Sequence, residues 1–151
     1  MKKQINLWAF AAVACVFLAP HAAHAQCTNA TLSNGWGYLL SGTDLVGVST
    51  EHRTEIGLFT FDGAGHFNLI DSGSIDGTIT RWQTSIGTYY VNPDCTGALI
   101  VHRDPRIVHF NFTISGDHTT LTLACTDSDA QVWNSMTHVY VSTYTGTATK
   151  Q

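Results

Sequence analysis

The chain has 151 residues, of which 12% are charged, 44% hydrophobic and 11% aromatic, and its formal net charge is −4. This composition is too apolar for an intrinsically disordered chain, and the length suits a single domain. The negative charge disfavours electrostatically driven binding to nucleic acid or to anionic membranes. No strand–glycine loop–helix motif occurs, which excludes a Rossmann or P-loop nucleotide site. We therefore expect a globular protein without a nucleic-acid partner.

Residues 1–25 have the pattern of a secretory signal peptide. Lys2 and Lys3 precede an apolar run from Leu7 to Ala19, and Ala23-His24-Ala25 places small residues at the −3 and −1 positions of a cleavage site. The run is shorter than the ~20 residues that a membrane-spanning helix needs. We predict cleavage after Ala25 and export to the periplasm or the medium. The remaining residues, 26–151, are expected to form one domain with no membrane span.

Export places the remaining cysteines, Cys27, Cys95 and Cys125, in an oxidising compartment where disulfides persist. Cys27 precedes the first expected strand and Cys95 lies in a turn, so both backbones can adapt to the geometry of a bridge. Cys125 ends the apolar alternation of Leu121 and Leu123 and resembles a small core residue. We predict a Cys27–Cys95 disulfide, and the sequence leaves the state of Cys125 open.

From Thr31 onward, short strand-like runs alternate with turn signals, and no window of ten residues has a helical pattern. Asp62-Gly63-Ala64-Gly65 and Asp76-Gly77 indicate hairpin turns. Residues 41–54 are rich in Gly, Ser and Thr and are expected to be loose. The expected strands are residues 36–40, 55–61, 66–72, 78–82, 86–91, 98–102, 107–114, 119–125 and 138–148.

Each expected strand alternates apolar and polar residues, so one face of the sheet is apolar. In residues 107–114, for example, Phe110 and Phe112 share one side while His109 and Asn111 share the other. An open sheet of this length would leave two unpaired edges and a large apolar face, and closure removes both. We predict an all-β fold, a single antiparallel up-and-down barrel of about eight strands. A two-sheet β-sandwich is the alternative.

Several motifs resemble those of a known group of proteins. The motifs are Gly57–Gly65 (GLFTFDGAG), Asp76–Thr80 (DGTIT) and Gly87–Gly97 (GTYYVNPDCTG), with Cys27-Thr28-Asn29 at the start. They resemble small exported bacterial proteins of unknown function that have a lipocalin-like or allene-oxide-cyclase-like β-barrel. The resemblance covers nearly all of residues 26–151 and implies the same barrel. Because its motifs are mainly turn chemistry, it implies no particular reaction.

Candidate catalytic and metal-binding residues are few. The chain has no HxH, HxxxH or HExxH spacing and no closely spaced cysteine pair, so we expect no metal site and no cofactor. Most carboxylates lie in turns, but Asp71 follows Phe67 and Leu69 on one strand face, which directs it into the barrel. A buried carboxylate is usually paired or functional, and Arg81 is a candidate partner. The alternative is a residue at the rim that bonds to backbone.

Aromatic residues occur on nearly every expected strand. An eight-stranded barrel is either packed solid or holds one small ligand. We predict that the protein binds a small apolar or aromatic molecule without transforming it, on a wall formed by Trp36, Tyr38, Phe59, Phe67, Tyr89 and Phe110. The ligand's identity and the oligomeric state are left open.

Two other functions are alternatives. One is a barrel isomerase or cyclase, which the resemblance suggests, with Asp71, Tyr89 or His109 supplying a proton or a dipole. His109 is the weakest of these candidates because its strand pattern directs it outward. The other is an envelope or adhesion module with a solid core that acts through its surface.

Overall fold

The computed structural model describes residues 26–46, 48–103, 106–126, 130–133 and 136–151, and the predicted signal peptide lies outside this range. The described chain is almost entirely β-structure, with one short 3-10 helix. None of its helices has the length and apolar character needed to cross a membrane. The elements are η1 (Asn29–Leu32), β1 (Asn34–Val46), β2 (Ser49–Phe61), β3 (His66–Ile75), β4 (Thr78–Val91), β5 (Thr96–Arg103), β6 (Arg106–Ile114), β7 (Thr120–Cys125), β8 (Ala130–Trp133) and β9 (Met136–Lys150).

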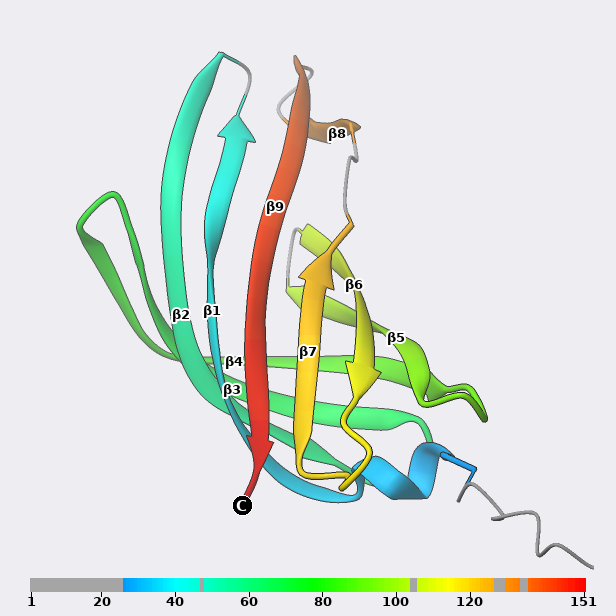
Figure 1. The fold of residues 1–151 in the computed structure, drawn as a ribbon. Helices are drawn as coiled ribbons and strands as arrows, with labels where there is room; N and C mark the ends of the chain where they lie inside the picture. Colours follow the sequence, from blue (N-terminus) through cyan, green and yellow to red (C-terminus); the bar gives the residue numbers. More distant parts are fainter. Residues whose placement is uncertain (1–25, 47, 104–105, 127–129, 134–135) are drawn as a thin grey trace, which may run out of the picture.

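Eight of the strands form one closed antiparallel barrel (Figure 1). β1 to β7 pair in sequence order, β9 pairs with β7, and β9 also pairs with β1, which closes the sheet. β8 pairs with the beginning of β9 and extends beyond the closed ring. The predicted up-and-down barrel is therefore confirmed, and the sandwich is excluded.

The prediction that residues 41–54 are loose was wrong. β1 and β2 remain paired to the tip of their hairpin, where Val46 lies opposite Ser49. β1 also pairs with β9 along this stretch, and the Thr43 and Thr143 hydroxyls lie 2.9 Å apart. β1 is thus paired on both sides and β2 is paired with β1 along this stretch, and these backbone hydrogen bonds override the weak strand preference of Gly and Ser.

Two further boundaries differ from the expectation. The runs 78–82 and 86–91 form one strand, β4, with an irregularity inside it, and the short strand β8 was not expected. The continuity of β4 and the existence of β8 both depend on pairing with a neighbouring strand. The alternation of residues within one segment gives no information about that pairing.

The inward side chains change character along the barrel axis. On β2 the sequence of inward residues runs from Phe61 and Phe59 to Glu55 and Arg53, and the other strands of this wall follow the same trend. On β3, Phe67 and Leu69 precede the buried Asp71. The period of two therefore produces an aromatic half and a charged half of one interior.

The aromatic end of the barrel is closed by η1. Leu32 is fully buried there, and its carbonyl accepts a hydrogen bond from the Trp36 indole at 3.0 Å. The Asn29 carbonyl accepts one from the Tyr89 hydroxyl at 3.0 Å, and the Asn29 side chain accepts one from the Val91 amide at 2.8 Å. η1 thus covers the aromatic half of the interior, and the charged half lies toward the other end of the barrel.

Candidate functional site

The six aromatic residues predicted to form a ligand wall are all buried in the barrel: Trp36, Tyr38, Phe59, Phe67, Tyr89 and Phe110. Tyr38 and Phe59 pack with ring centroids 4.5 Å apart, and Phe59 and Phe67 with centroids 5.4 Å apart. Tyr38, Phe59 and Phe110 also line an interior cavity of about 30 Å³. A cavity of that size holds about one water molecule. In this conformation the rings therefore act mainly as packed core.

The three residues predicted as catalytic candidates do not meet. Asp71 is buried in the charged half of the interior. Tyr89 also points inward, but its hydroxyl bonds to the η1 carbonyl of Asn29 at the other end. His109 is half-buried on the face of β6 opposite the buried Phe110.

Charged side chains form a connected cluster inside the barrel, which we call the charged cluster: Tyr38, Asp44, Arg53, Glu55, Asp71 and Arg103. Glu55 Oε1 accepts hydrogen bonds from both Arg53 Nη1 and Arg103 Nη1 at 2.9 Å. Arg103 Nη2 also donates to Asp71 Oδ2, which accepts a second bond from the Tyr38 hydroxyl at 3.1 Å. A single carboxylate thus joins the two guanidinium groups.

The far side of the charged cluster is built from Asp44, Arg53 and Ser142. Arg53 Nε lies 3.3 Å from Asp44 Oδ2, and the Ser142 hydroxyl donates to Asp44 Oδ1 at 2.6 Å. Burying several charges in one place is expensive even when they are paired, and replacing such networks by apolar residues is often neutral or stabilising. A buried ionic cluster beside a cavity is therefore a candidate functional site.

The partner of Asp71 is Arg103, and the prediction of Arg81 was wrong. Arg81 is exposed, because it lies where β4 departs from regular pairing with β3. Arg103 follows the buried Leu99 and Val101 at intervals of two on β5, so its side chain enters the barrel. Asp71 is consequently an interior ion-pair residue and does not have the rim position considered as the alternative.

Burial and charged neighbours shift the pKa of three residues of this cluster, Asp71, Tyr38 and Arg103. Burial raises the pKa of the Asp71 carboxyl, because the effect of desolvation and of nearby Glu55 exceeds that of the Arg103 guanidinium. Burial and the neighbouring Asp71 also raise the pKa of the Tyr38 hydroxyl. The pKa of Arg103 is raised as well, since Glu55 and Asp71 outweigh its own desolvation. Tyr38 is therefore a neutral hydrogen-bond donor, and Arg103 stays charged.

A β-bulge lies beside the charged cluster. Asp71 is paired with Gln83 and Gly73 with Thr80, so β4 has one residue more than β3 between these pairs. Trp82, inside the bulge, has φ 54°, and its amide bonds to the Ser72 hydroxyl at 3.2 Å. Bulges redirect side chains and are frequent next to functional sites. Here the bulge leaves the Trp82 side chain 74% exposed.

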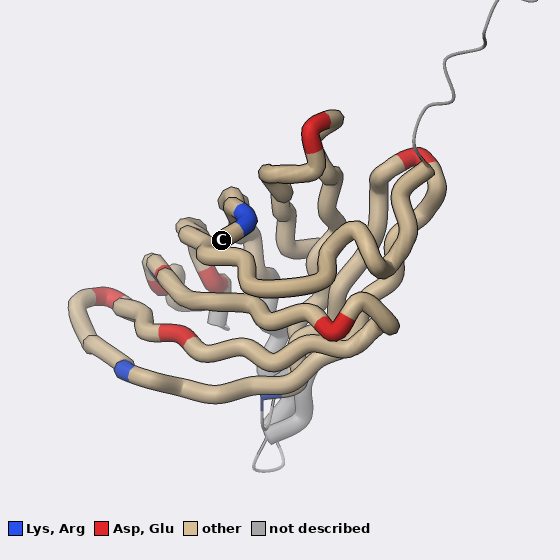
Figure 2. The backbone as a smooth tube through the Cα atoms, turned by 90° about the horizontal axis from the view of Figure 1, so that it is seen from below, with Lys and Arg blue, Asp and Glu red and all other residues tan. Residues whose placement is uncertain are grey.

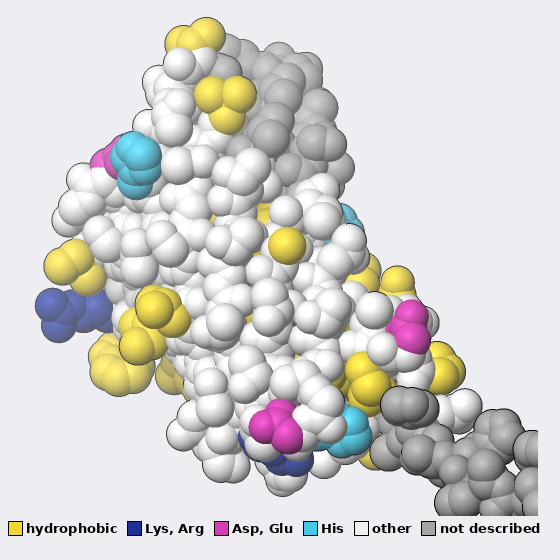
Figure 3. Space-filling view, in the orientation of Figure 1, with side chains coloured by type: hydrophobic (Ala, Val, Ile, Leu, Met, Phe, Trp, Pro, Cys, Tyr) yellow, Lys and Arg dark blue, Asp and Glu magenta, His cyan; other side chains and the backbone are white. Residues whose placement is uncertain are grey.

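An outer groove of about 880 Å³ runs along the bulge. Its apolar lining comes from Leu58, Ile70, Trp82 and Ile86 on β2, β3 and β4. In Figure 3, hydrophobic side chains are exposed on the left of the molecule, the side on which β2 and the β3–β4 hairpin lie, and another group is exposed at the lower right. Apolar walls with a few polar groups, in a volume of roughly 300–1,000 Å³, are typical of small-molecule sites.

The groove also carries polar side chains that have unused hydrogen-bonding capacity. Asn68, Gln83 and Thr84 line it, and their side chains make no hydrogen bond to another residue of the described chain. They lie beside the apolar residues, so a ligand with both an apolar body and polar substituents would find partners for both.

The groove and the charged cluster meet at a break in the barrel wall. β4 pairs with β5 only from Ile86 onward, and the preceding part of β4 follows the β3–β4 hairpin away from the barrel (Figure 1). Arg103 and Leu69 line both the outer groove and the interior cavity, and Arg103 Nε donates to the Ser85 hydroxyl at 3.3 Å. Arg103 therefore occupies the passage between the two spaces.

The predicted Cys27–Cys95 disulfide is present, with Cα atoms 5.0 Å apart. It links the segment before η1 to the β4–β5 turn. Cys125 is half-buried and packs against the core, as its alternation with Leu121 and Leu123 predicted.

Comparison with family models, with curated proteins and with solved structures gave no match. The barrel fold therefore rests on the strand pairing alone. The resemblance to lipocalin-like or allene-oxide-cyclase-like proteins stays a prediction.

Proposed function

We propose that this protein binds a small molecule with an apolar or aromatic body, without transforming it, in the outer groove beside Trp82. The observation that carries the proposal is the exposed Trp82 side chain, held in a left-handed backbone conformation within a groove of about 880 Å³. Bulky residues keep this conformation only where the surrounding structure compensates, and such positions concentrate at binding sites.

The outer groove fits a ligand better than the ring-lined interior. The interior cavity has room for about one water molecule, whereas the groove has the volume of a small-molecule site. In this proposal the six interior aromatic residues belong to the core and do not line the groove. Their predicted direct contact with ligand would require Arg103 to leave the passage.

Export to the periplasm or the medium is part of the proposal. It is supported by the disulfide, which persists in oxidising compartments, and by the pattern of residues 1–25. The same placement suits the predicted resemblance to small exported bacterial barrels. It also gives the binding site access to molecules outside the cytoplasm.

The test is native mass spectrometry of the purified protein for a co-purifying small molecule, together with titration by a panel of apolar fluorophores. We expect saturable binding of at least one probe. Trp82→Ala should weaken that binding about tenfold, because a buried aromatic contact contributes roughly 1.5 kcal/mol.

Tyr90→Ala is the matched control. Tyr90 is another exposed aromatic residue of β4, but it lines a different groove of about 530 Å³, with His109. Its removal should leave probe affinity within about twofold. Failure of every probe to bind, or equal losses in the two variants, would refute the proposed site.

One observation favours a second function, the isomerase or cyclase considered above. Asp71 and Tyr38 are joined by a hydrogen bond next to the cavity, and burial raises the pKa of both groups. A carboxyl group of raised pKa beside a neutral hydroxyl is suited to proton transfer. Of the three predicted candidates, only Asp71 belongs to this arrangement.

Binding and catalysis are separated by Asp71→Asn. Any ligand identified by mass spectrometry is incubated with the protein and followed by NMR, because isomerisation leaves its mass unchanged. Conversion by the wild type that Asp71→Asn abolishes would establish catalysis. An unchanged ligand, bound equally by both proteins, would retain the binding function alone.

A further inference from the structure

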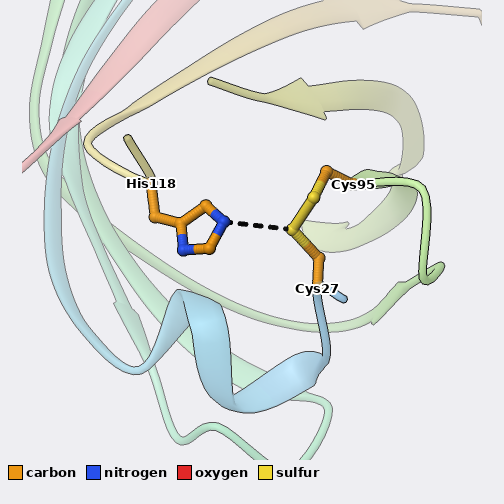
Figure 4. A group of neighbouring side chains, drawn as sticks. All are labelled: Cys27, Cys95 and His118. Carbon is orange, nitrogen blue, oxygen red and sulfur yellow. Dashed lines mark hydrogen bonds between the residues drawn. A yellow bond between two sulfur atoms is a disulfide. The ribbon is translucent and has the colours of Figure 1, made fainter. Parts of the chain in front are cut away.

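Three loops that are far apart in the sequence meet at the η1 end of the barrel. They are the segment before η1, the β4–β5 turn and the β6–β7 turn, and they bring together Cys27, Cys95 and His118 (Figure 4). The imidazole of His118 points at the disulfide, with Nε2 3.5 Å from Cys27 Sγ. The two sulfur atoms and one imidazole nitrogen all lie within 4.8 Å of one another.

Each of these residues is held by contacts other than the disulfide. The His118 amide donates to the Ser115 carbonyl at 2.8 Å. The Cys95 amide donates to the Asn92 carbonyl at 3.0 Å, and the Cys95 carbonyl accepts from the Ile114 amide at 2.8 Å. The Cys27 amide lies 3.4 Å from the Pro93 carbonyl that accepts its hydrogen bond. Opening the disulfide would therefore leave the three side chains close together.

We propose that, once the disulfide is reduced, Cys27, Cys95 and His118 bind one Zn²⁺ ion, with water as the fourth ligand. A tetrahedral ion with bonds of roughly 2.3 Å to sulfur and 2.0 Å to nitrogen places these atoms roughly 3.5 Å apart. The present distance between Cys27 Sγ and His118 Nε2 already matches that value. The two sulfur atoms have to separate, from bonded contact to roughly 3.8 Å, while Cys95 Sγ, which lies within 4.8 Å of the imidazole nitrogen, has to come to roughly 3.5 Å from it.

The chemistry needs a dithiol as reductant. Its thiolate attacks Cys95 Sγ, which is more accessible because Cys95 is half-buried whereas Cys27 is 1% exposed. The Cys27 thiolate leaves beside His118, and the second thiol of the reductant then releases Cys95 and forms a cyclic disulfide. Binding of Zn²⁺ to the two thiols and the neutral imidazole releases two protons. In the oxidised protein neither sulfur is a thiolate, so the site exists only after reduction.

The test uses the full chain carrying Cys15→Ala and Cys125→Ala, so that Cys27 and Cys95 are the only cysteines. The reduced, desalted protein is titrated anaerobically with Co²⁺, then with Zn²⁺. We expect one ion per chain, a thiolate-to-cobalt charge-transfer band, and visible bands of tetrahedral cobalt that Zn²⁺ abolishes. The oxidised protein should show none of these.

His118→Ala in this background should weaken binding by more than about tenfold, since even an outer-sphere partner of a metal ligand contributes that much. His66→Ala is the matched control, because His66 is also a turn histidine and its side chain is 73% exposed. It should leave affinity unchanged. Circular dichroism records the β-structure throughout.

Metal that binds equally with and without His118, or reduced protein that binds no metal, would overturn the proposal. If reduction unfolds the chain, Zn²⁺ must restore β-structure in the parent and not in His118→Ala. Restoration in both, or in neither, would also overturn it.

Discussion

The backbone of Trp82 lies at φ 54° in the middle of a strand, a conformation that costs about 1–2 kcal/mol for a residue with a β-carbon. Its indole is mostly exposed, so little packing repays this cost. Trp36, by contrast, is completely buried and hydrogen-bonded. We therefore expect Trp36 to stabilise the fold and Trp82 to contribute little to its stability.

We expect Trp82→Gly to change the free energy of unfolding by less than about 1 kcal/mol, because relief of the left-handed strain offsets the greater flexibility of glycine. Trp36→Ala should lower it by about 3–5 kcal/mol. Urea unfolding followed by circular dichroism measures both. A comparable loss in the two variants would mean that the Trp82 indole is structural.

Asp117 makes the β6–β7 turn sensitive to acid. Hydrogen bonds from the Ser115 and Thr119 hydroxyls and from the Thr119 amide lower its pKa to about 2, from 3.8. Because the folded-state pKa is lowered, the contribution of Asp117 to stability is complete at neutral pH and is lost as the pH falls from about 4 to about 2. Asp117→Asn should lower the urea midpoint at pH 7 and leave it unchanged at pH 2. A difference of equal size at both values would contradict this assignment.

Sequence alternation predicted that Asp71 points into the barrel, and the same rule applies to Arg103 after Leu99 and Val101. The expected strand ended at residue 102 and left Arg103 outside, whereas β5 continues through Arg103. Nothing in the residues around Trp82 predicted the bulge, since a bulge is a relation between two strands. For a single residue, the sequence indicates whether its side chain points into the barrel, but it does not indicate which residue that side chain will contact.

Strand β4 shows how closely the barrel wall is packed. A β-carbon on Gly87 would overlap the carbonyl oxygen of Ile100 on β5 and the ring of Phe67 on β3. A β-carbon on Gly116, in the β6–β7 turn, would have no neighbour within 4 Å. The two glycines thus offer a matched pair, one confined and one free.

Gly87→Ala should lower the free energy of unfolding by about 1–3 kcal/mol, the usual range for overpacking. Gly116→Ala should leave it unchanged or raise it by less than about 1 kcal/mol, because alanine restricts the unfolded chain. Thermal and urea unfolding of both variants test this. A tolerant Gly87 would show that β3 and β5 can separate around β4.

The β1–β2 hairpin shows how an element can exceed its local propensity. Its outer half, within residues 41–54, has the composition of a loop, yet it carries Asp44 and Arg53 of the charged cluster. Pairing with β9 on the other side keeps it extended. Two of the six residues of the charged cluster were therefore missed with this segment.

At the scale of the whole molecule, the Cys27–Cys95 disulfide closes a loop of 68 residues. Chain-entropy arithmetic for this separation gives a stabilisation of about 4 kcal/mol, an upper value. We expect reduction under metal-free conditions to lower the free energy of unfolding by up to that amount. The barrel should persist, because β1 and β9 close it independently of the bridge.

Urea unfolding of the oxidised and reduced protein in the presence of a chelator measures this difference. Cys125→Ala is the control for the third thiol. Reduced protein without β-structure in the absence of urea would show that the bridge is required for the fold.

Charge is also distributed at this scale. In the view from below, acidic residues are spread over separate strands and turns (Figure 2). Two of the basic residues, Arg53 and Arg103, are committed to the charged cluster. The expectation that nucleic acid is not a partner stays a prediction.

The sequence by itself determined the all-β class, the antiparallel order of the strands, most turns and the pairing of Cys27 with Cys95. The class, the strand order and the turns follow from local signals, since a period of two or a glycine turn is readable within a few residues. The cysteine pairing followed from the small number of exported cysteines and from the places of Cys27 and Cys95 at element ends. Only the tertiary structure decided that Arg103 meets Asp71, that Trp82 is displaced into a groove, and that His118 reaches the disulfide. Each of these joins residues from different strands or loops, and their meeting depends on the register and curvature of the closed barrel, which no single segment encodes.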